Sequence, residues 1–161
     1  MTVCSHAFAP RCLVLAVLLA GTAACADSTG PTPDPTVASV AGFYRADSNG
    51  GEVTTVEGGT PTDWLAEGGS IRLDLRGDGT TAGRIFIPGA AEDGGDYEED
   101  LAGGWSIAGG AVHLDHEADT FLRDMSFQLR GERLEGSAEF SGLRVQVVLV
   151  RESVGSGAAP Q

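Results

Sequence analysis

The chain has 161 residues and a formal net charge of -13, with 23 acidic residues, 10 arginines and no lysine. This composition excludes nucleic-acid binding through phosphate neutralisation, which needs clustered cations. Anionic lipid headgroups would likewise repel so acidic a surface. The length suits one domain once an N-terminal signal is removed.

The first 24 residues have the layout of a secretory signal peptide. One arginine and no acid precede an apolar run over residues 12–20, and small residues follow at 21–24. The run is about half as long as a membrane-spanning helix requires. We therefore expect residues 1–24 to be cleaved and the chain to be exported.

Cys25 follows two small residues, an arrangement that resembles the lipobox of bacterial lipoproteins, in which the cysteine receives a diacylglyceryl group before cleavage. Thr22 departs from this pattern, which usually has an aliphatic residue there. Cys25 would be the only cysteine of the mature chain and could form no internal disulfide. We expect a lipid anchor in the bacterial cell envelope, and Ala26 favours the outer membrane. The alternative is ordinary cleavage, giving a soluble periplasmic or secreted protein.

The remainder divides into a tether, one domain and a tail. Residues 25–38 begin at the lipid-attachment cysteine and carry three prolines without apolar periodicity, which predicts an extended tether. The domain is expected over residues 39–152, and residues 153–161 are expected to form a disordered tail.

From residue 40 onward, apolar and polar residues alternate with a period of two, and glycine-rich turns interrupt the alternation. Asn49-Gly50 is a strong hairpin signal, and Pro88 ends a strand because it lacks a ladder donor. The expected strands cover residues 40–46, 52–56, 71–76, 80–87, 105–107, 112–115, 121–129, 134–140 and 143–150. The pattern predicts an all-β fold, an antiparallel up-and-down meander of eight or nine strands that closes into a small barrel. A two-sheet β-sandwich is the alternative.

Several segments carry a resemblance to a known family. Gly42-Phe-Tyr44 is similar to the start of lipocalin-like domains, and residues 73–80, 104–112 and 134–136 resemble segments of the small lipocalin-like domains of exported bacterial lipoproteins. The resemblance covers roughly residues 40–151. It implies a meander barrel with a pocket at one end, and it transfers no ligand site residue by residue.

The inward-facing side chains of the expected barrel form the candidate binding site for a ligand. A barrel of eight strands is just wide enough to be filled by its own side chains or to take one small ligand. The candidate residues are Ile71, Leu73, Leu75, Ile85, Ile87, Trp105, Met125, Phe127, Leu129, Val145 and Val147, and the same inward set includes Leu143 and Leu149. Trp64 is expected to anchor a loop, with a lid over the barrel mouth as the alternative.

The sequence contains no strong motif for catalysis or metal binding. The acidic residues 92–100 lack the spacing of a calcium loop and are expected to form a solvated loop. His113 and His116 point to opposite faces of a strand. Ser106 lacks the second glycine of a nucleophile elbow. We therefore expect no enzymatic activity, no cofactor and no metal.

Two functions are consistent with these patterns. The first is a cell-envelope lipoprotein whose lipocalin-like barrel binds one small apolar ligand and meets the membrane only through its lipid anchor. The second is a structural or interaction protein of the envelope with a packed, ligand-free barrel and an unidentified protein partner. Neither involves nucleic acid.

Overall fold

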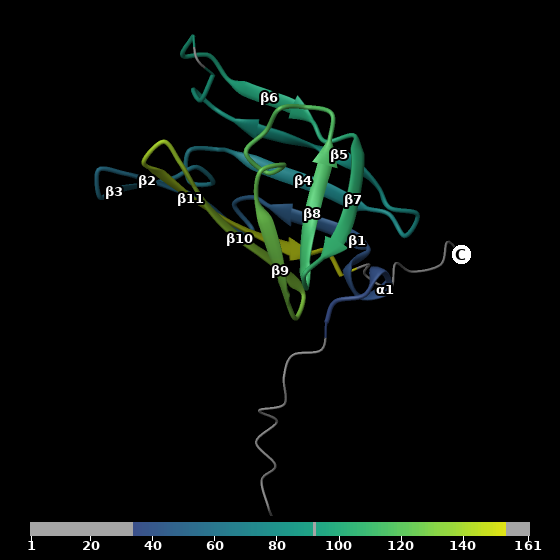
Figure 1. Ribbon diagram of the computed structural model, residues 1–161. Helices are drawn as coiled ribbons and strands as arrows, with labels where there is room; N and C mark the ends of the chain where they lie inside the picture. Colours follow the sequence, from purple (N-terminus) through teal and green to yellow (C-terminus); the bar gives the residue numbers. More distant parts are fainter. Residues whose placement is uncertain (1–33, 92, 154–161) are drawn as a thin grey trace, which may run out of the picture. The chain divides into compact units, whose positions relative to one another are not determined.

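The computed structural model describes residues 34–91 and 93–153, which form an all-β body (Figure 1). The expected signal peptide, Cys25, most of the expected tether and the tail from residue 154 lie outside the described residues. In chain order the elements are α1 (Val37–Val40), β1 (Gly42–Ala46), β2 (Glu52–Glu57), β3 (Thr60–Asp63), β4 (Ser70–Leu75), β5 (Thr80–Ile87), β6 (Tyr97–Asp100), β7 (Gly103–Ala108), β8 (Ala111–His116), β9 (Ser126–Arg130), β10 (Arg133–Phe140) and β11 (Leu143–Arg151).

Eight of these strands close into an antiparallel barrel. Their order around the ring is β1, β4, β5, β7, β8, β9, β10 and β11, and β11 returns to β1 through the pairs Tyr44 with Arg151 and Arg45 with Val150. Each ring strand therefore lies beside the next ring strand along the chain. The predicted up-and-down barrel is confirmed, and the sandwich alternative is excluded.

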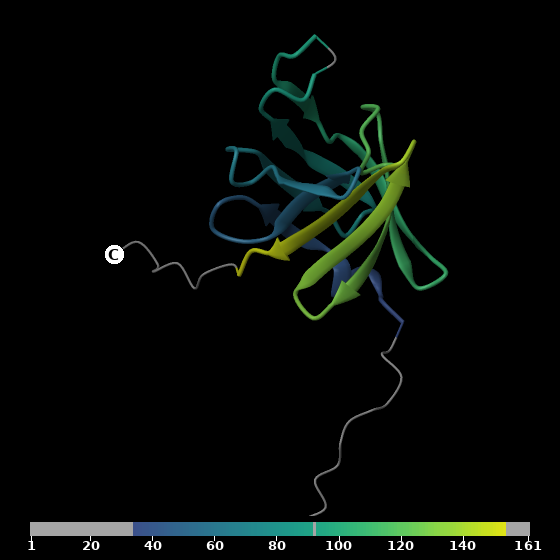
Figure 2. The ribbon, with the colours of Figure 1, turned by 90° about the vertical axis from the view of Figure 1, so that its left-hand side faces the viewer.

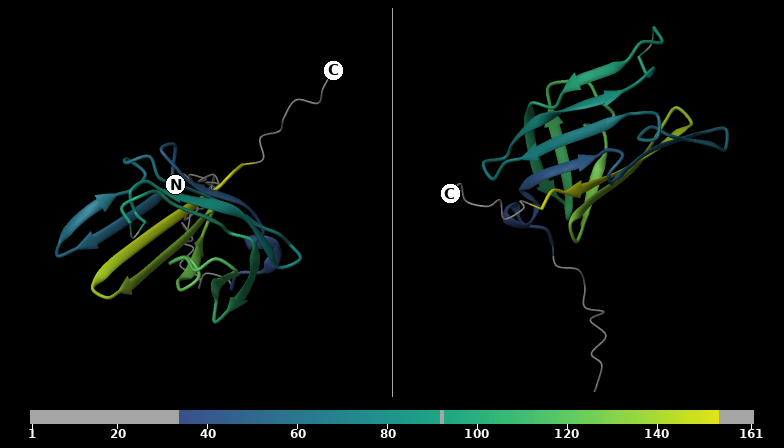
Figure 3. Two further views of the ribbon diagram at one scale, coloured as in Figure 1. Left: turned by 90° about the horizontal axis from the view of Figure 1, so that it is seen from above. Right: turned by 180° about the vertical axis from the view of Figure 1, so that it is seen from behind.

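Three further strands lie outside the ring and lengthen one end of it. β2 pairs with the first half of β11, and β3 pairs with β2. β6 pairs with the second half of β5, which is available because β7 pairs only with Thr80 and Thr81. We call this end the mouth: it is formed by the β2–β3, β5–β6 and β10–β11 hairpins and by the loop 117–125. Figures 1 and 3 show these hairpins at the end of the barrel away from α1.

The opposite end, called here the closed end, is covered by α1 and filled with side chains. The Tyr44 hydroxyl donates to the carbonyl oxygen of Val40 at 2.6 Å, and Val40 is fully buried. The Arg151 guanidinium lies 5.2 Å from the centroid of the Tyr44 ring. Trp105 is buried, and its Nε1 donates to the Arg76 carbonyl oxygen at 2.8 Å. This end of the barrel is therefore sealed.

The interior between the two ends is packed with inward-facing side chains. Alternation along β4 buries Ile71, Leu73 and Leu75, and alternation along β11 (seen from the side in Figure 2) buries Val145, Val147 and Leu149. Burial of each such side chain contributes about 1.5–3 kcal/mol, so these two strands supply a large part of the driving force for closure.

The segment 121–129 departs from the expected continuous strand. The strand β9 begins only at Ser126, and the preceding residues turn, with the Arg123 amide donating to Thr120 and the Met125 amide to Leu122. Leu122 is fully buried although the alternation would have placed it outward. The turn lets Leu122 and Met125 both enter the core, and this gain in buried area outweighs the period-two pattern of Phe121, Met125 and Phe127.

Two segments expected to be loops are strands. Thr60–Asp63 forms β3 at the edge of the sheet, where Pro61 is tolerated because an edge strand has one side without ladder partners. Tyr97–Asp100, within the acidic run expected to be a solvated loop, forms β6. Its backbone pairs with the edge of β5 that β7 leaves free beyond Thr81, and its acids stay exposed.

Candidate ligand-binding site at the barrel mouth

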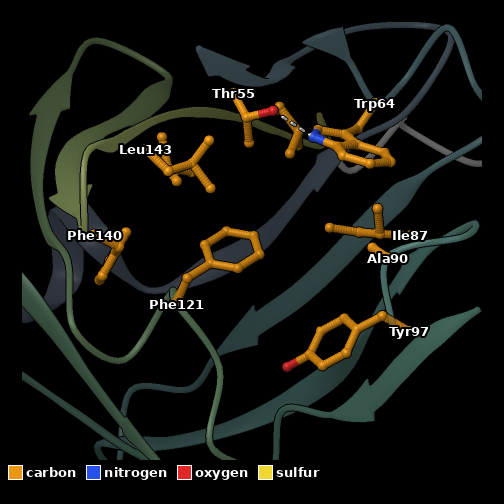
Figure 4. A pocket seen from close by; sticks show the side chains of 10 residues that line it. Thr55, Trp64, Ile87, Ala90, Tyr97, Phe121, Phe140 and Leu143 are labelled. Carbon is orange, nitrogen blue, oxygen red and sulfur yellow. Dashed lines mark hydrogen bonds between the residues drawn. The ribbon is translucent and has the colours of Figure 1, made fainter. Parts of the chain in front are cut away.

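A cavity of about 410 Å³, partly open to solvent, lies at the mouth (Figure 4). Its wall is almost entirely apolar and draws on every element that forms the mouth. The lining residues are Val53, Thr55, Trp64, Ile87, Ala90, Tyr97, Phe121, Phe140, Leu143 and Val145. Pockets that bind small molecules typically measure about 300–1,000 Å³ and have apolar walls with few polar groups. This cavity falls within that range.

The β2–β3 hairpin supplies one wall. Trp64 follows β3 directly, and its amide donates to the Val53 carbonyl oxygen at 2.9 Å, which continues the ladder by one residue. Its indole Nε1 donates to Thr55 Oγ1 at 3.0 Å (dashed in Figure 4). The indole is therefore fixed by its own hairpin while its ring faces the cavity. Trp64 is therefore held by its own hairpin and lines the cavity, and a role as a lid over the mouth stays a prediction.

The β5–β6 hairpin supplies a second wall. Ile87 and Tyr97 stand directly opposite each other in the register and so point to the same side of the sheet. The Tyr97 hydroxyl lies 3.3 Å from the Asp119 carbonyl oxygen, to which it donates. Burial raises the pKa of Tyr97, and the carboxylates of Glu99 and Asp119 raise it further. The phenol is therefore neutral, and its hydroxyl group is hydrogen-bonded to the backbone of the loop 117–125.

The loop 117–125 places Phe121 in the cavity wall. The buried His116 contacts this loop through Thr120. His116 ends β8 with 2% of its surface exposed, and its Nε2 lies 2.5 Å from Oγ1 of the buried Thr120. Nδ1 of His116 is buried without a hydrogen-bond partner among the described residues. Burial lowers the pKa of His116, and Arg123 lowers it further, whereas Asp115 and Asp124 oppose this. The imidazole is accordingly neutral and ties the loop to the barrel.

The β10–β11 hairpin completes the wall with Phe140, Leu143 and Val145. Phe140 and Leu143 pair directly across the turn at Ser141-Gly142, so both stand at the tip of the hairpin and are half-buried. Ser141 has a φ of 51°, in the left-handed region that a tight hairpin turn requires.

The structure brings two of the predicted site residues to the cavity. Ile87 and Val145 line it. The others lie deeper in the barrel: Ile71, Leu73, Leu75, Ile85, Met125, Phe127 and Val147 are buried, Trp105 is buried at the closed end, and Leu129 is half-buried against the core. These side chains are packed against one another, and ligand contact by them stays a prediction.

The sequence did not single out most of the residues that line the mouth. Tyr97, Phe121 and Phe140 stand at the ends of strands or in a connecting loop, next to turns, where alternation no longer assigns a face. The signal in the sequence is an aromatic residue beside a turn, and Trp64 shows it as well. Leu143 was placed correctly in the inward-facing set.

The structure places Ser106 of β7 and His113 of β8 on the outer surface of the barrel. Ser106 stands opposite His113 in the register. However, Nδ1 of His113 lies 3.3 Å from Ser126 Oγ and Nε2 lies 3.3 Å from the Ala108 carbonyl oxygen, so both ring nitrogens have other partners. Within residues 34–91 and 93–153, no three metal-ligating side chains converge. The described part of the chain contains no helix long and apolar enough to cross a membrane.

No protein family, curated protein or solved structure matches the chain.

Proposed function

We propose that this protein is an exported lipoprotein of the bacterial cell envelope that binds one small apolar ligand in the mouth of its barrel. The observation that carries the proposal is the cavity of about 410 Å³ with an almost wholly apolar wall at the one open end of a packed barrel. The proposed role is binding without catalysis, and it assigns no catalytic residue or cofactor.

The aromatic residues of the mouth support this proposal. Trp64, Tyr97, Phe121 and Phe140 all line the cavity, and each is only half-buried. Large apolar side chains are otherwise rarely exposed in the described residues, where Val37 and Phe43 are the marked cases. An apolar ligand that covers these four rings would remove their exposed surface from water. This burial would contribute a favourable binding free energy of about 25 cal/mol per Å² of apolar surface.

Titration of the purified protein with the neutral fluorescent probe N-phenyl-1-naphthylamine tests the proposal. We expect one equivalent to bind with enhanced fluorescence. Ala90→Trp, which places an indole in the mouth from an exposed loop position, should weaken binding at least about tenfold, or about 1.4 kcal/mol. Ala108→Trp, at the exposed last residue of β7 near the closed end, is the matched control and should leave binding unchanged. Absence of probe binding, or equal effects of the two variants, would refute a ligand site at the mouth.

The alternative, an interaction protein with a ligand-free barrel, is favoured by one observation. The interior below the mouth is filled, and most of the predicted inward set contributes to that filling. The same titration separates the two functions, because a ligand-free protein leaves the probe unbound while Ala90→Trp and Ala108→Trp behave alike.

Lipid anchoring at Cys25 is a separate part of the proposal, and this residue lies outside the described residues. Its support is the order of apolar run, small residues and single mature cysteine. Mass spectrometry of the mature N-terminus should find a diacylglyceryl group on Cys25, and Cys25→Ser should release the protein from the membrane fraction. An unmodified N-terminus at any of residues 23–26 would contradict anchoring and leave the soluble periplasmic or secreted form.

A further inference from the structure

Strand β6 has two chemically different faces at the mouth. Tyr97 and Glu99 stand opposite Ile87 and Ile85, two inward-facing residues of β5, and therefore point to the cavity side of the sheet. Glu98 and Asp100 point to the other side, where they form ion pairs with Arg84, at 3.0 Å for Glu98 and 4.0 Å for Asp100. Of these three carboxylates, only that of Glu99 shares the face of Tyr97.

Glu99 makes no ion pair within residues 34–91 and 93–153. Asp119, the second acid near Tyr97, pairs with Arg123 at 2.5 Å and is partly compensated. Burial raises the pKa of Tyr97, and the nearby carboxylates of Glu99 and Asp119 raise it further. Glu99, a carboxylate without an ion pair among the described residues, therefore stands two residues along β6 from Tyr97, on the same face of the strand as this cavity-lining ring.

Inside the cavity, the two N–H and O–H groups of the aromatic residues are already engaged. The Trp64 indole N–H is donated to Thr55, and the Tyr97 hydroxyl is donated to the Asp119 carbonyl oxygen. A carboxylate headgroup would find only the neutral Thr55 hydroxyl as a side-chain donor in the wall and would be repelled by the charge of Glu99. A cationic headgroup would be attracted both by that charge and by the faces of the aromatic rings.

We infer that the mouth selects a ligand with an apolar body and a positively charged headgroup, the body lying in the aromatic cavity and the headgroup at Glu99. This inference rests on the proposed function, because it requires that the mouth binds a ligand at all. It excludes simple fatty acids as the preferred ligand.

Displacement of bound N-phenyl-1-naphthylamine tests the inference. Decyltrimethylammonium, decanol and decanoate share one chain length and differ in the charge of the headgroup. At low ionic strength and neutral pH, with each competitor monomeric, we expect decyltrimethylammonium to compete about tenfold more tightly than decanoate. The advantage should shrink as salt is added, because the rim is exposed and its charge is screened.

A matched pair of variants on β6 locates the effect. Glu99→Gln should weaken decyltrimethylammonium at least about threefold at low salt and leave decanol unchanged, since only the cation senses the lost charge. Glu98→Gln removes the same charge from the other face of the same strand and should change neither competitor by more than about twofold. Because both positions are exposed, neither variant disturbs the packed interior.

The outcomes separate this inference from the proposed function. If N-phenyl-1-naphthylamine and decanol bind but decanoate competes as tightly as the cation, or if Glu98→Gln and Glu99→Gln have equal effects, the inference is overturned and the apolar site stands. If none of the probes binds, the proposed function fails and the inference fails with it.

Discussion

At the closed end of the barrel, Tyr44 and Trp105 carry polar tips into the packing and find backbone acceptors there, and Arg151 covers the Tyr44 ring. At the mouth, Trp64 and Tyr97 also satisfy their polar tips, but their rings line a cavity of about 410 Å³. The two ends use the same residue types, so aromatic content does not explain the difference. The difference lies in what surrounds the rings: α1 and the Arg151 side chain cover Tyr44 at the closed end, whereas the hairpins of the mouth enclose a cavity.

The largest expected effect comes from comparing two phenylalanine truncations, one in the packed interior and one at the mouth. The first should mainly lower stability, and the second should mainly weaken ligand binding. Phe127 is 1% exposed, and Phe127→Ala should lower the free energy of unfolding by about 3–5 kcal/mol because it leaves a cavity in the core. Phe121→Ala at the mouth should cost only about 1 kcal/mol, since the ring is half-buried. It should weaken the binding of N-phenyl-1-naphthylamine about three- to tenfold through the lost aromatic contact.

Urea unfolding and probe titration of both variants measure these effects. Similar stability losses at the two positions would show that the mouth is packed as tightly as the interior, and would remove the distinction between the two regions.

Adding a methyl group to the filled interior should have the next largest effect. A Cβ at Gly136 would lie 2.8 Å from Cε1 of Phe127 and 3.1 Å from Cε of Met125, and these side chains have little room to move. Gly136→Ala should therefore destabilise the protein by about 1–3 kcal/mol. Gly77→Ala, in the β4–β5 turn with no atom within 4 Å of the added carbon, is the control and should be close to neutral. A neutral Gly136→Ala, measured by urea unfolding, would contradict a fully packed interior.

The smallest expected effect is confined to acidic pH and concerns the loop that carries Phe121. Burial holds the pKa of His116 below its ordinary value, so the unfolded chain takes up this proton more readily than the folded chain. The stability that neutral His116 provides is therefore fully present above the unfolded pKa of about 6.5 and decreases as the pH falls from there towards the folded pKa.

Comparing a variant with the unsubstituted protein isolates the contribution of His116. From pH 7.5 to pH 5, the free energy of unfolding should fall less in His116→Gln than in the unsubstituted protein. Equal slopes in the two proteins would show that His116 does not hold the loop in a pH-dependent way.

The ring of the barrel could be predicted from alternation alone in its regular strands. Ile71, Leu73 and Leu75 face the core, as do Val145, Val147 and Leu149, because a side chain in a strand can point only to one of two faces. The mouth could not be predicted in the same way. Tyr97 belongs to an acidic run that pairs only because part of β5 is left uncovered, and Phe121 belongs to a turn that replaces an expected strand.

The sequence by itself determined the all-β class, the meander, the inward faces of the long strands and the strong acidity. Period-two alternation and turn residues are local properties, and they need no information about the rest of the chain. Only the tertiary structure decided that the interior is filled, that the aromatic residues of four separate segments meet at one end, and that Glu99 faces the cavity while Glu98 does not. Those features depend on which strand edges remain unpaired when the ring closes, and closure is a property of the whole barrel.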